Sequence, residues 1–232
     1  MIEVSSPVVL ISGANRGIGA AVARELGARG WKLSLGMRSP APGGEPGDSL
    51  VHRYDARAVG SERDWVAATV ERYGRIDAIV ANAGILSSKT VAEAEDDELD
   101  ALLDVNVKAP LRLVRAAWPW LKQSGRGRVA VVVSLSGKRV KAARSGLYSV
   151  SKFAALGLAH AIRHAGWDDG IRCTAICPGF VATDMAASVT AQPLSTMIQP
   201  QDLARIVALT LELPNTASIA EIPVNCLLEE AY

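Results

Sequence analysis

The stretch that decides the fold runs Val8-Val-Leu-Ile-Ser-Gly-Ala-Asn-Arg-Gly-Ile-Gly19. Its first four residues are aliphatic, as in a short strand that is buried on both faces of a sheet. Glycines follow at positions 13, 17 and 19, and the Ala-rich residues 20–29 favour a helix. Such a turn brings an anion close to the first helical turn, where free N–H groups and the helix dipole favour negative charge. The stretch therefore predicts a phosphate-binding turn; an ordinary turn without a ligand is the alternative.

Composition places the chain among ordinary globular proteins. Of its 232 residues, 49% are hydrophobic and 21% are charged, and the formal net charge is +1. This balance gives no sign of a nucleic-acid or membrane partner, and no apolar run approaches the ~20 residues of a membrane span. The start of the chain lacks a signal-peptide pattern, and three cysteines are too few for a disulfide framework. We expect one domain over residues 1–232, located in the cytoplasm.

Apolar runs with strand character alternate with helical patterns along the chain. The expected strands after the first lie at 31–35, 50–55, 76–81, 129–133, 171–177 and 219–224. The expected helices after the first lie at 62–73, 96–121, 148–164 and 202–213. On the helix at 62–73 we expect Ala67, Val70 and Tyr73 to face the core. The alternation predicts a Rossmann-like α/β domain, a parallel sheet with helices on both faces.

Two arginines bear on the kind of dinucleotide that the glycine turn would bind. An acidic residue about 20 positions after the glycines usually binds the ribose 2′-hydroxyl of NAD, whereas an Arg accommodates the 2′-phosphate of NADP. Arg38 occupies this place, and Arg16 lies within the glycine turn. Because guanidinium groups suit a phosphate, we expect NADP(H) to be preferred over NAD(H). The alternative is that both are solvated surface arginines.

A candidate catalytic pair opens the helix at 148–164. Tyr148 and Lys152 are four residues apart and share one helix face. A free Tyr, with a pKa of ~10, is a poor acid–base group at neutral pH, and we expect the neighbouring ammonium to lower that pKa. Ser134 lies 14 residues earlier, at the carboxyl end of a strand, where open α/β sheets place their ligands. Ser136 is the alternative to Ser134, and an unremarkable surface Tyr and Lys is the alternative to the pair.

These motifs, in this order, resemble the short-chain dehydrogenase/reductase family, and the resemblance runs from Val8 to about Thr183. It implies a seven-stranded parallel sheet and an NADPH-dependent enzyme that interconverts a carbonyl and an alcohol. It assigns the catalytic roles to Ser134, Tyr148, Lys152 and Asn106. In the family, Asn106 of the Asn-Val-x-x-Pro motif kinks its helix and holds a water of the proton relay.

The resemblance also implies a set of cofactor contacts. Asp55 is expected to accept a hydrogen bond from the adenine amino group, and Asn82 to brace neighbouring strands through its amide. The full set of expected cofactor-binding residues is Gly13, Asn15, Arg16, Gly17, Ile18, Gly19, Arg38, Asp55, Asn82, Ala83, Gly84, Tyr148, Lys152, Pro178, Gly179, Val181 and Thr183. Ser12 stands where the family usually has Thr, which keeps the hydroxyl.

Three further segments have open interpretations. The basic loop 138–144 carries Lys138, Arg139, Lys141 and Arg144, and it is either a solvated surface or a site for an anionic substrate. Residues 184–200 are the expected substrate lid, in which Met185, Leu194, Met197 and Ile198 are candidates to line an apolar pocket. His160 and His164 lack a third ligand nearby, so we expect no metal site.

Two other functions remain open beside the carbonyl reductase. One is the more specific 3-oxoacyl-carrier-protein reductase, which the basic loop allows. The other is a non-catalytic, NADPH-sensing regulatory protein on the same fold, since a fold does not determine a function. Trp118 and Trp120 are either core residues or part of a subunit interface. Because their helix usually dimerises in the family, we favour the interface and expect a homodimer or homotetramer.

Overall fold

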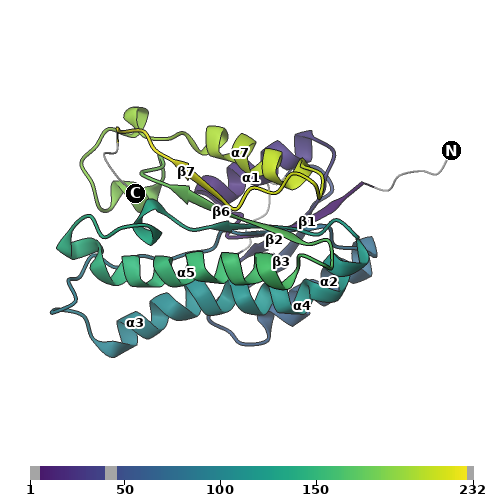
Figure 1. Ribbon diagram of the computed structural model, residues 1–232, viewed down its shortest axis with the longest axis horizontal. Coiled ribbons are helices and arrows are strands. Elements are labelled where there is room, and N and C mark those ends of the chain that lie inside the picture. The colour runs from purple at the N-terminus through teal and green to yellow at the C-terminus, as the bar shows by residue number, and fades with distance from the viewer. Residues whose placement is uncertain (1–5, 40–45, 229–232) are drawn as a thin grey trace.

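Seven parallel strands form a single sheet in the order β3-β2-β1-β4-β5-β6-β7 (Figure 1). The computed structural model describes residues 6–39 and 46–228. The strands are β1 (Val8–Ser12), β2 (Lys32–Met37), β3 (Leu50–Arg53), β4 (Ala78–Ala81), β5 (Arg128–Val132), β6 (Arg172–Pro178) and β7 (Glu221–Val224). This arrangement confirms the predicted Rossmann-like sheet, whose order reverses between β1 and β4.

Helices cover both faces of the sheet. The α-helices are α1 (Gly17–Ala28), α2 (Ser61–Tyr73), α3 (Asp96–Leu103), α4 (Ala109–Gln123), α5 (Gly146–Ala165), α6 (Asp184–Ala187) and α7 (Pro200–Glu212). Four short segments complete the list: the π-helical η1 (Asp104–Lys108) and the 3-10 turns η2 (Leu135–Gly137), η3 (Ala143–Ser145) and η4 (Leu194–Thr196). In Figure 1, α1 and α7 lie above the sheet, and α2, α4 and α5 lie below it.

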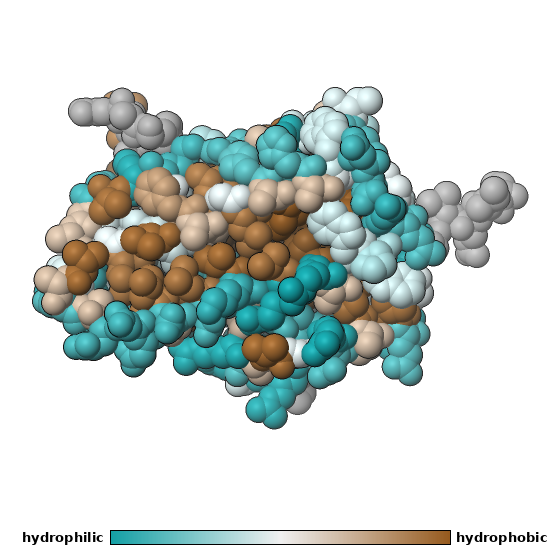
Figure 2. Space-filling view, turned by 60° about the horizontal axis from the view of Figure 1, so that its bottom comes forward, coloured by the Kyte–Doolittle hydropathy of each residue, from teal (hydrophilic) through white to brown (hydrophobic). Residues whose placement is uncertain are grey.

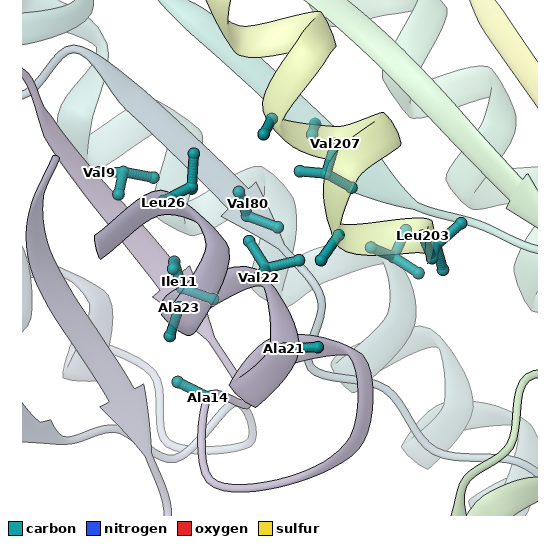
Figure 3. Close-up of a cluster of buried hydrophobic side chains, with 14 of the residues drawn as sticks. Val9, Ile11, Ala14, Ala21, Val22, Ala23, Leu26, Val80, Leu203 and Val207 are labelled. Carbon is teal, nitrogen blue, oxygen red and sulfur yellow. The ribbon is translucent and has the colours of Figure 1, made fainter. Parts of the chain in front are cut away.

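The sheet is buried on both faces, so each strand contributes to two hydrophobic clusters. Val9 and Ile11 of β1 point towards α1 and α7, where they pack with Val22 and Val207 (Figure 3). Leu10, between them, belongs to the cluster beneath α2, α4 and α5. This alternation follows from the two-residue period of a strand, and it explains the continuous apolar run in the sequence.

The long helix expected at 96–121 is divided. The π-helical segment η1 separates α3 from α4 and contains the buried Asn106. Pro110 follows at the start of α4, where it lacks the N–H that would continue a regular helical ladder. A helix interruption therefore does occur at Asn106, and it turns this side chain inward.

The helix α2 directs Val70 towards a hydrophobic cluster, as expected, but the expectation is wrong for Ala67. The buried residues of the helix are Glu62, Trp65, Val66 and Thr69, whereas Ala67 is exposed. The cause is a charged side chain that finds a buried partner: Glu62 Oε1 accepts a hydrogen bond from Arg112 Nε of α4 at 2.8 Å. A pattern of apolar residues does not reveal such a pair.

Among the described residues, no helix has both the length and the hydropathy required to span a bilayer.

Candidate active site

A cleft of 1510 Å³ opens at the carboxyl ends of the strands. Residues from the glycine turn, the ends of β2, β4, β5 and β6, the start of α5 and the segment after β6 line it. Every site residue predicted from the sequence lines this cleft except Gly19 and Asn106. Both of these are buried just behind its wall.

The glycine turn has the conformation that its sequence requires. Gly13 and Gly17 adopt φ angles of +67° and +55°, which side chains disfavour. A Cβ at Gly19 would lie 2.2 Å from the Gly13 carbonyl oxygen, so this helix start packs directly against the turn. The N-cap of α1 is Arg16, whose side chain does not cap the helix. The N–H groups of the first turn are therefore directed towards the cleft without a side-chain acceptor from the N-cap.

Ser12 and Asn82 join the glycine turn to the end of β4. The Ser12 hydroxyl accepts hydrogen bonds from the backbone N–H groups of Asn82 and Ala83, both at 3.0 Å. The Asn82 amide Nδ2 donates to the carbonyl oxygens of Ser12 at 3.0 Å and Gly13 at 3.2 Å. The predicted bracing by Asn82 is confirmed, and the hydroxyl of Ser12 has a definite structural use.

Ser134, Tyr148 and Lys152 meet at the centre of the cleft. Ser134 lies just after β5, and its hydroxyl accepts a hydrogen bond from Ser136 N at 3.1 Å. Lys152 is only 5% exposed, and its Nζ donates to the Val132 carbonyl oxygen at 3.0 Å. The same Nζ lies 5.7 Å from the centre of the Tyr148 ring. Ser136 also lines the cleft, but its side chain lies on the 3-10 turn η2, beyond Ser134.

The surroundings shift the pKa values of both titratable groups. Burial raises the pKa of Tyr148 to about 12, and its contact with the Ser134 side chain lowers it by less. Burial also lowers the pKa of Lys152 to about 8. The expected decrease in the Tyr148 pKa is therefore wrong for this structure, because removing the phenolate from water outweighs its favourable contacts.

Asn106 lies behind the cleft wall and forms hydrogen bonds with residues on two sides of it. Its Oδ1 accepts a hydrogen bond from Ile85 N at 3.0 Å, and its Nδ2 donates to Ile85 O and to Ser151 Oγ, both at 2.9 Å. A Cβ on Gly84 would lie 3.3 Å from Asn106 Oδ1 and 3.8 Å from Lys152 Nζ. Asn106 thus connects the chain after β4 to α5, one layer behind Lys152.

Basic groups gather at the end of the cleft near β2 and β3. Arg38 is exposed and, within the described part of the chain, makes no hydrogen bond or ion pair. Arg16 forms an exposed ion pair with Asp184, from Nη1 to Oδ2 at 2.8 Å. Asp55 Oδ1 accepts a hydrogen bond from Arg57 N at 3.0 Å, which brings a third arginine to this end.

The two ends of the segment expected to be a lid lie side by side and form a narrow neck, which consists of residues 180–182 and Ile198. Ala182 N donates to Ile198 O at 2.9 Å and Ile198 N donates to Phe180 O at 3.0 Å, which form an isolated parallel bridge. Of the four expected pocket residues, Met185 lines the cleft, but Leu194 does not. Met197 and Ile198 are buried at the neck, so the expectation that they line the pocket is wrong.

The sequence analysis missed other cleft residues. They include Arg57 after β3, Ser87 and Ser88 after β4, and Asn225 after β7. All of them follow the carboxyl end of a parallel strand, and this position in the sequence is enough to mark them as candidates for the cleft lining. His160, by contrast, lies outside the cleft lining, and its Nε2 is 2.7 Å from Glu221 Oε1. In residues 6–39 and 46–228, no three His, Cys, Asp or Glu side chains gather as metal ligands would.

Comparison with known proteins agrees with this geometry. The family model described as short chain dehydrogenase matches residues 7–194, which include the glycine turn and the central three residues. The chain belongs to the short-chain dehydrogenase family. The structure of this dehydrogenase is similar to that of an alcohol dehydrogenase from the archaeon Thermococcus sibiricus complexed with 5-hydroxy-NADP. The TM-score is 0.85 at 28% identity, over 98% of this chain and 99% of that one.

Two further relatives are similar to this chain, one in structure and one in sequence. A short chain dehydrogenase from Burkholderia cenocepacia in complex with NADP has a TM-score of 0.84 at 26% identity, over 95% of this chain and 96% of that one. An agropine synthesis reductase of Rhizobium rhizogenes is 39% identical over 98% of this chain, but over only 54% of its own length. This short-chain dehydrogenase spans about half the length of the first curated relatives that it matches.

The residues of this short-chain dehydrogenase fit a dinucleotide. The close approach at Gly19 and the uncapped first turn of α1 suit a pyrophosphate. Near the end of β2, the exposed Arg38 suits a ribose phosphate. The end of β6 and the segment after it line the cleft beyond Ser134 with Pro178, Gly179, Val181 and Thr183. Thr183 Oγ1 accepts a hydrogen bond from Ala186 N at 3.4 Å, so it also caps α6.

Proposed function

We propose that the chain is an NADPH-dependent oxidoreductase that interconverts a carbonyl and an alcohol. The observation that carries this proposal is the meeting of Ser134, Tyr148 and Lys152 in the cleft that the glycine turn enters. Membership of the short-chain dehydrogenase family supports it. A non-catalytic NADPH-sensing protein would have no need to keep a phenol and an ammonium together in the centre of that cleft.

Tyr148 is the proposed general acid. NADPH, when bound, supplies a hydride to the carbonyl carbon, and the chain itself has to supply the proton. With a pKa of about 12, the phenol keeps its proton at neutral pH and is able to donate it to the carbonyl oxygen. The adjacent Ser134 hydroxyl donates a hydrogen bond to the same oxygen and stabilises the negative charge that develops there.

Lys152 and Asn106 have supporting roles in this proposal. Lys152 Nζ is held by the Val132 carbonyl, and its other N–H groups are available to the nicotinamide ribose hydroxyls. Its low pKa of about 8 suits a group that passes protons towards Tyr148. Asn106 keeps the chain after β4 in place beside Lys152, and the family resemblance gives it the water of the proton relay.

A preference for NADPH over NADH is the next part of the proposal. Arg16, Arg38 and Arg57 all line the adenosine end of the cleft, where Asp55 and Asp184 are the acidic lining residues. Each of these carboxylates already has a partner, Arg57 N and Arg16 respectively. Arg38 is therefore the best-placed cation for a 2′-phosphate. The NADP named for two of the similar structures is consistent with this choice.

Turnover measurements test the function directly. Oxidation of NADPH is followed with aldehydes, ketones and 3-oxoacyl thioesters, first for the wild type and then for Tyr148→Phe. We expect Tyr148→Phe to lose about 10²–10⁴ in rate while NADPH binding, measured by fluorescence, is retained. Tyr73→Phe is the control, because Tyr73 lies outside the cleft lining.

Three other results of these measurements would each support a different interpretation of the protein. Near-full turnover in Tyr148→Phe would refute the catalytic assignment. Tight NADPH binding by the wild type without turnover of any carbonyl would favour the regulatory protein. A strong preference for carrier-protein thioesters would favour the 3-oxoacyl-carrier-protein reductase.

A homodimer or homotetramer is the last part of the proposal. The face formed by α4 and α5 carries a broad apolar area (Figure 2). Leu111, Val150 and Phe153 on these helices are 42–48% exposed, and Trp118 and Trp120 are partly buried beside them. Such an apolar area is typical of an interface between subunits. Size-exclusion chromatography with light scattering should show a multimer for the wild type and a smaller species for Phe153→Asp.

A further inference from the structure

We infer that the carbonyl substrate carries an oxyanion, a carboxylate or a phosphate, which the basic loop 138–144 binds. This inference rests on the proposed function and names the substrate class of the same cleft. The loop connects Ser134 to Tyr148, the two residues proposed to contact the reacting oxygen. A charged group that it binds is therefore part of the same small molecule.

The structure brings three of the four basic residues to the cleft. Arg139, Lys141 and Arg144 line it, whereas Lys138 Nζ forms an ion pair with Glu221 instead. Arg144 lies in η3 and precedes Tyr148 by four residues. The turn η3 leads directly into α5, whose first turn contains Tyr148, and both residues line the cleft. The positive charge and the proposed proton donor therefore belong to the same cleft.

Within residues 6–39 and 46–228, few acidic side chains face the basic loop. The described cleft lining contains two carboxylates, Asp55, which follows β3, and Asp184, which is ion-paired with Arg16. The Glu93 carboxylate, which accepts hydrogen bonds from Thr90 N at 2.9 Å and Oγ1 at 3.0 Å, acts on the charge of Arg144 and offsets one of the three basic groups of Arg139, Lys141 and Arg144. Counted over the described residues, a positive charge therefore remains beside the proposed substrate site.

The hydrogen-bonding capacity of Arg144 and Lys141 also remains available. Arg144 Nη1 donates to the Ser88 carbonyl oxygen at 3.3 Å, a neutral acceptor that leaves the other guanidinium N–H groups for a ligand. Lys141 is exposed and has no hydrogen bond or ion pair within the described part of the chain. An ammonium beside a guanidinium fork suits the two oxygens of a carboxylate or the three of a phosphate.

Another part of the cleft lining contributes apolar side chains, beside the polar Thr183, Asp184 and Ser188. Phe180, Met185 and Val189 lie there, on the segment that follows β6. A substrate with a charged end and a carbon skeleton would therefore place its anion at the basic loop and its apolar part against these side chains. A neutral ketone of the same shape would gain only the second set of contacts.

Matched pairs of probes test the inference. The pairs are 4-oxopentanoate with its methyl ester, and dihydroxyacetone phosphate with dihydroxyacetone; each pair keeps the carbonyl and changes the charge. We expect kcat/KM for at least one anion to exceed that for its neutral partner about tenfold, with the advantage falling as salt is added. The pair that shows the advantage distinguishes a carboxylate from a phosphate.

Charge-removing variants locate the site. In Lys141→Gln/Arg144→Gln we expect kcat/KM for the preferred anion to fall about tenfold, and that for its neutral partner to change less than about twofold. Arg24→Gln/Lys32→Gln is the control, since it removes two exposed cations outside the cleft lining. Equal losses for anion and neutral partner, or equal losses in the control, would overturn the inference.

A binding measurement separates this inference from the proposed function. The dissociation constants of 4-oxopentanoate and of inorganic phosphate are measured by NMR titration without NADPH, so that turnover is not required. Binding that weakens only in Lys141→Gln/Arg144→Gln supports the anion site even if no carbonyl is reduced. Tyr148-dependent reduction of neutral ketones, without any effect of the two substitutions on anions, would retain the enzyme and reject the anion site.

Discussion

The side-chain amide of Asn106 pairs with both backbone groups of Ile85, accepting from N at 3.0 Å and donating to O at 2.9 Å. This pairing substitutes for a strand neighbour just after β4 ends. Replacing Asn106 with Leu would leave two backbone groups of Ile85 without these partners. We expect a loss of about 2–4 kcal/mol in the free energy of unfolding, or about 5–15 °C in Tm.

Thermal unfolding of Asn106→Leu beside Asn106→Asp tests this role. Asp keeps the acceptor for Ile85 N but turns a buried charge towards the Ile85 carbonyl oxygen, so its loss should be larger at neutral pH and should decrease as the pH is lowered and the carboxylate is protonated. Equal stability of Asn106→Leu and the wild type would show that the pairing contributes nothing.

The buried pair of Glu62 and Arg112 should be stabilising only as a pair. The Arg112 side chain is 12% exposed and that of Glu62 is 2% exposed, and Arg112 Nη2 also donates to the Ala56 carbonyl at 2.6 Å. Removing one partner leaves a buried charge, so Arg112→Met and Glu62→Leu should each cost about 3–5 kcal/mol in urea unfolding. The double variant should cost less than the sum of the two. An additive double variant would contradict this coupling.

The ion pair of Arg16 and Asp184 should affect the choice of dinucleotide. The Asp184 carboxylate forms an ion pair with Arg16. We propose that the Arg16 guanidinium lies near the 2′-phosphate of NADPH. Because both side chains are largely exposed, the effect is small: Asp184→Asn should raise the ratio of NADPH to NADH affinity by about 2–5-fold at low salt. Arg16→Gln should lower the same ratio.

Asp202→Asn is the matched control for the dinucleotide prediction. Asp202 forms a comparable exposed pair with Arg205 on α7, at 2.9 Å, outside the cleft lining. Fluorescence titration with both dinucleotides gives the ratio. A ratio that moves equally in both Asp variants would place the effect in the overall charge of the protein rather than in Arg16.

Lys152 should make stability increase with pH in a defined window. Its pKa is about 8 in the folded chain, against an ordinary value of 10.5 for a solvated lysine, because burial disfavours the ammonium. Between these values the unfolded chain binds more protons, so the free energy of unfolding rises with pH. Relative to Lys152→Met, the wild type should gain about 2 kcal/mol between about pH 8 and pH 10. A pH-independent difference between the two would contradict a lowered pKa.

The sequence predicted the sheet well because its strands are buried on both faces. Continuous apolar runs such as the one in Val8–Ser12, which lies between Pro7 and Gly13, leave little choice of structure. The order of motifs along the chain also brought nearly all the predicted cofactor residues to one cleft. Parallel strands place their carboxyl ends at one edge, so motifs that follow strands meet there.

The errors arise where a polar residue is buried or a pKa depends on surroundings. Glu62 looks like a surface residue until Arg112, 50 positions away, is seen beside it. The Tyr148 pKa depends on how much water the fold removes, which spacing to Lys152 does not reveal. Met197 and Ile198 are apolar, and the sequence alone does not distinguish an apolar residue that lines a pocket from one that is buried in the core.

The bridge between Val181 and Ile198 has a consequence for how this cleft can change. Its hydrogen bonds join backbone groups, and the Val181 and Ile198 side chains are buried in the hydrophobic cluster, so both positions are kept when the loop between them changes. The loop that it closes is therefore a cassette, which an exchange with another member of the family can lengthen, shorten or replace without disturbing β6 or α7. New specificities should be obtainable by grafting residues 183–197 as one unit.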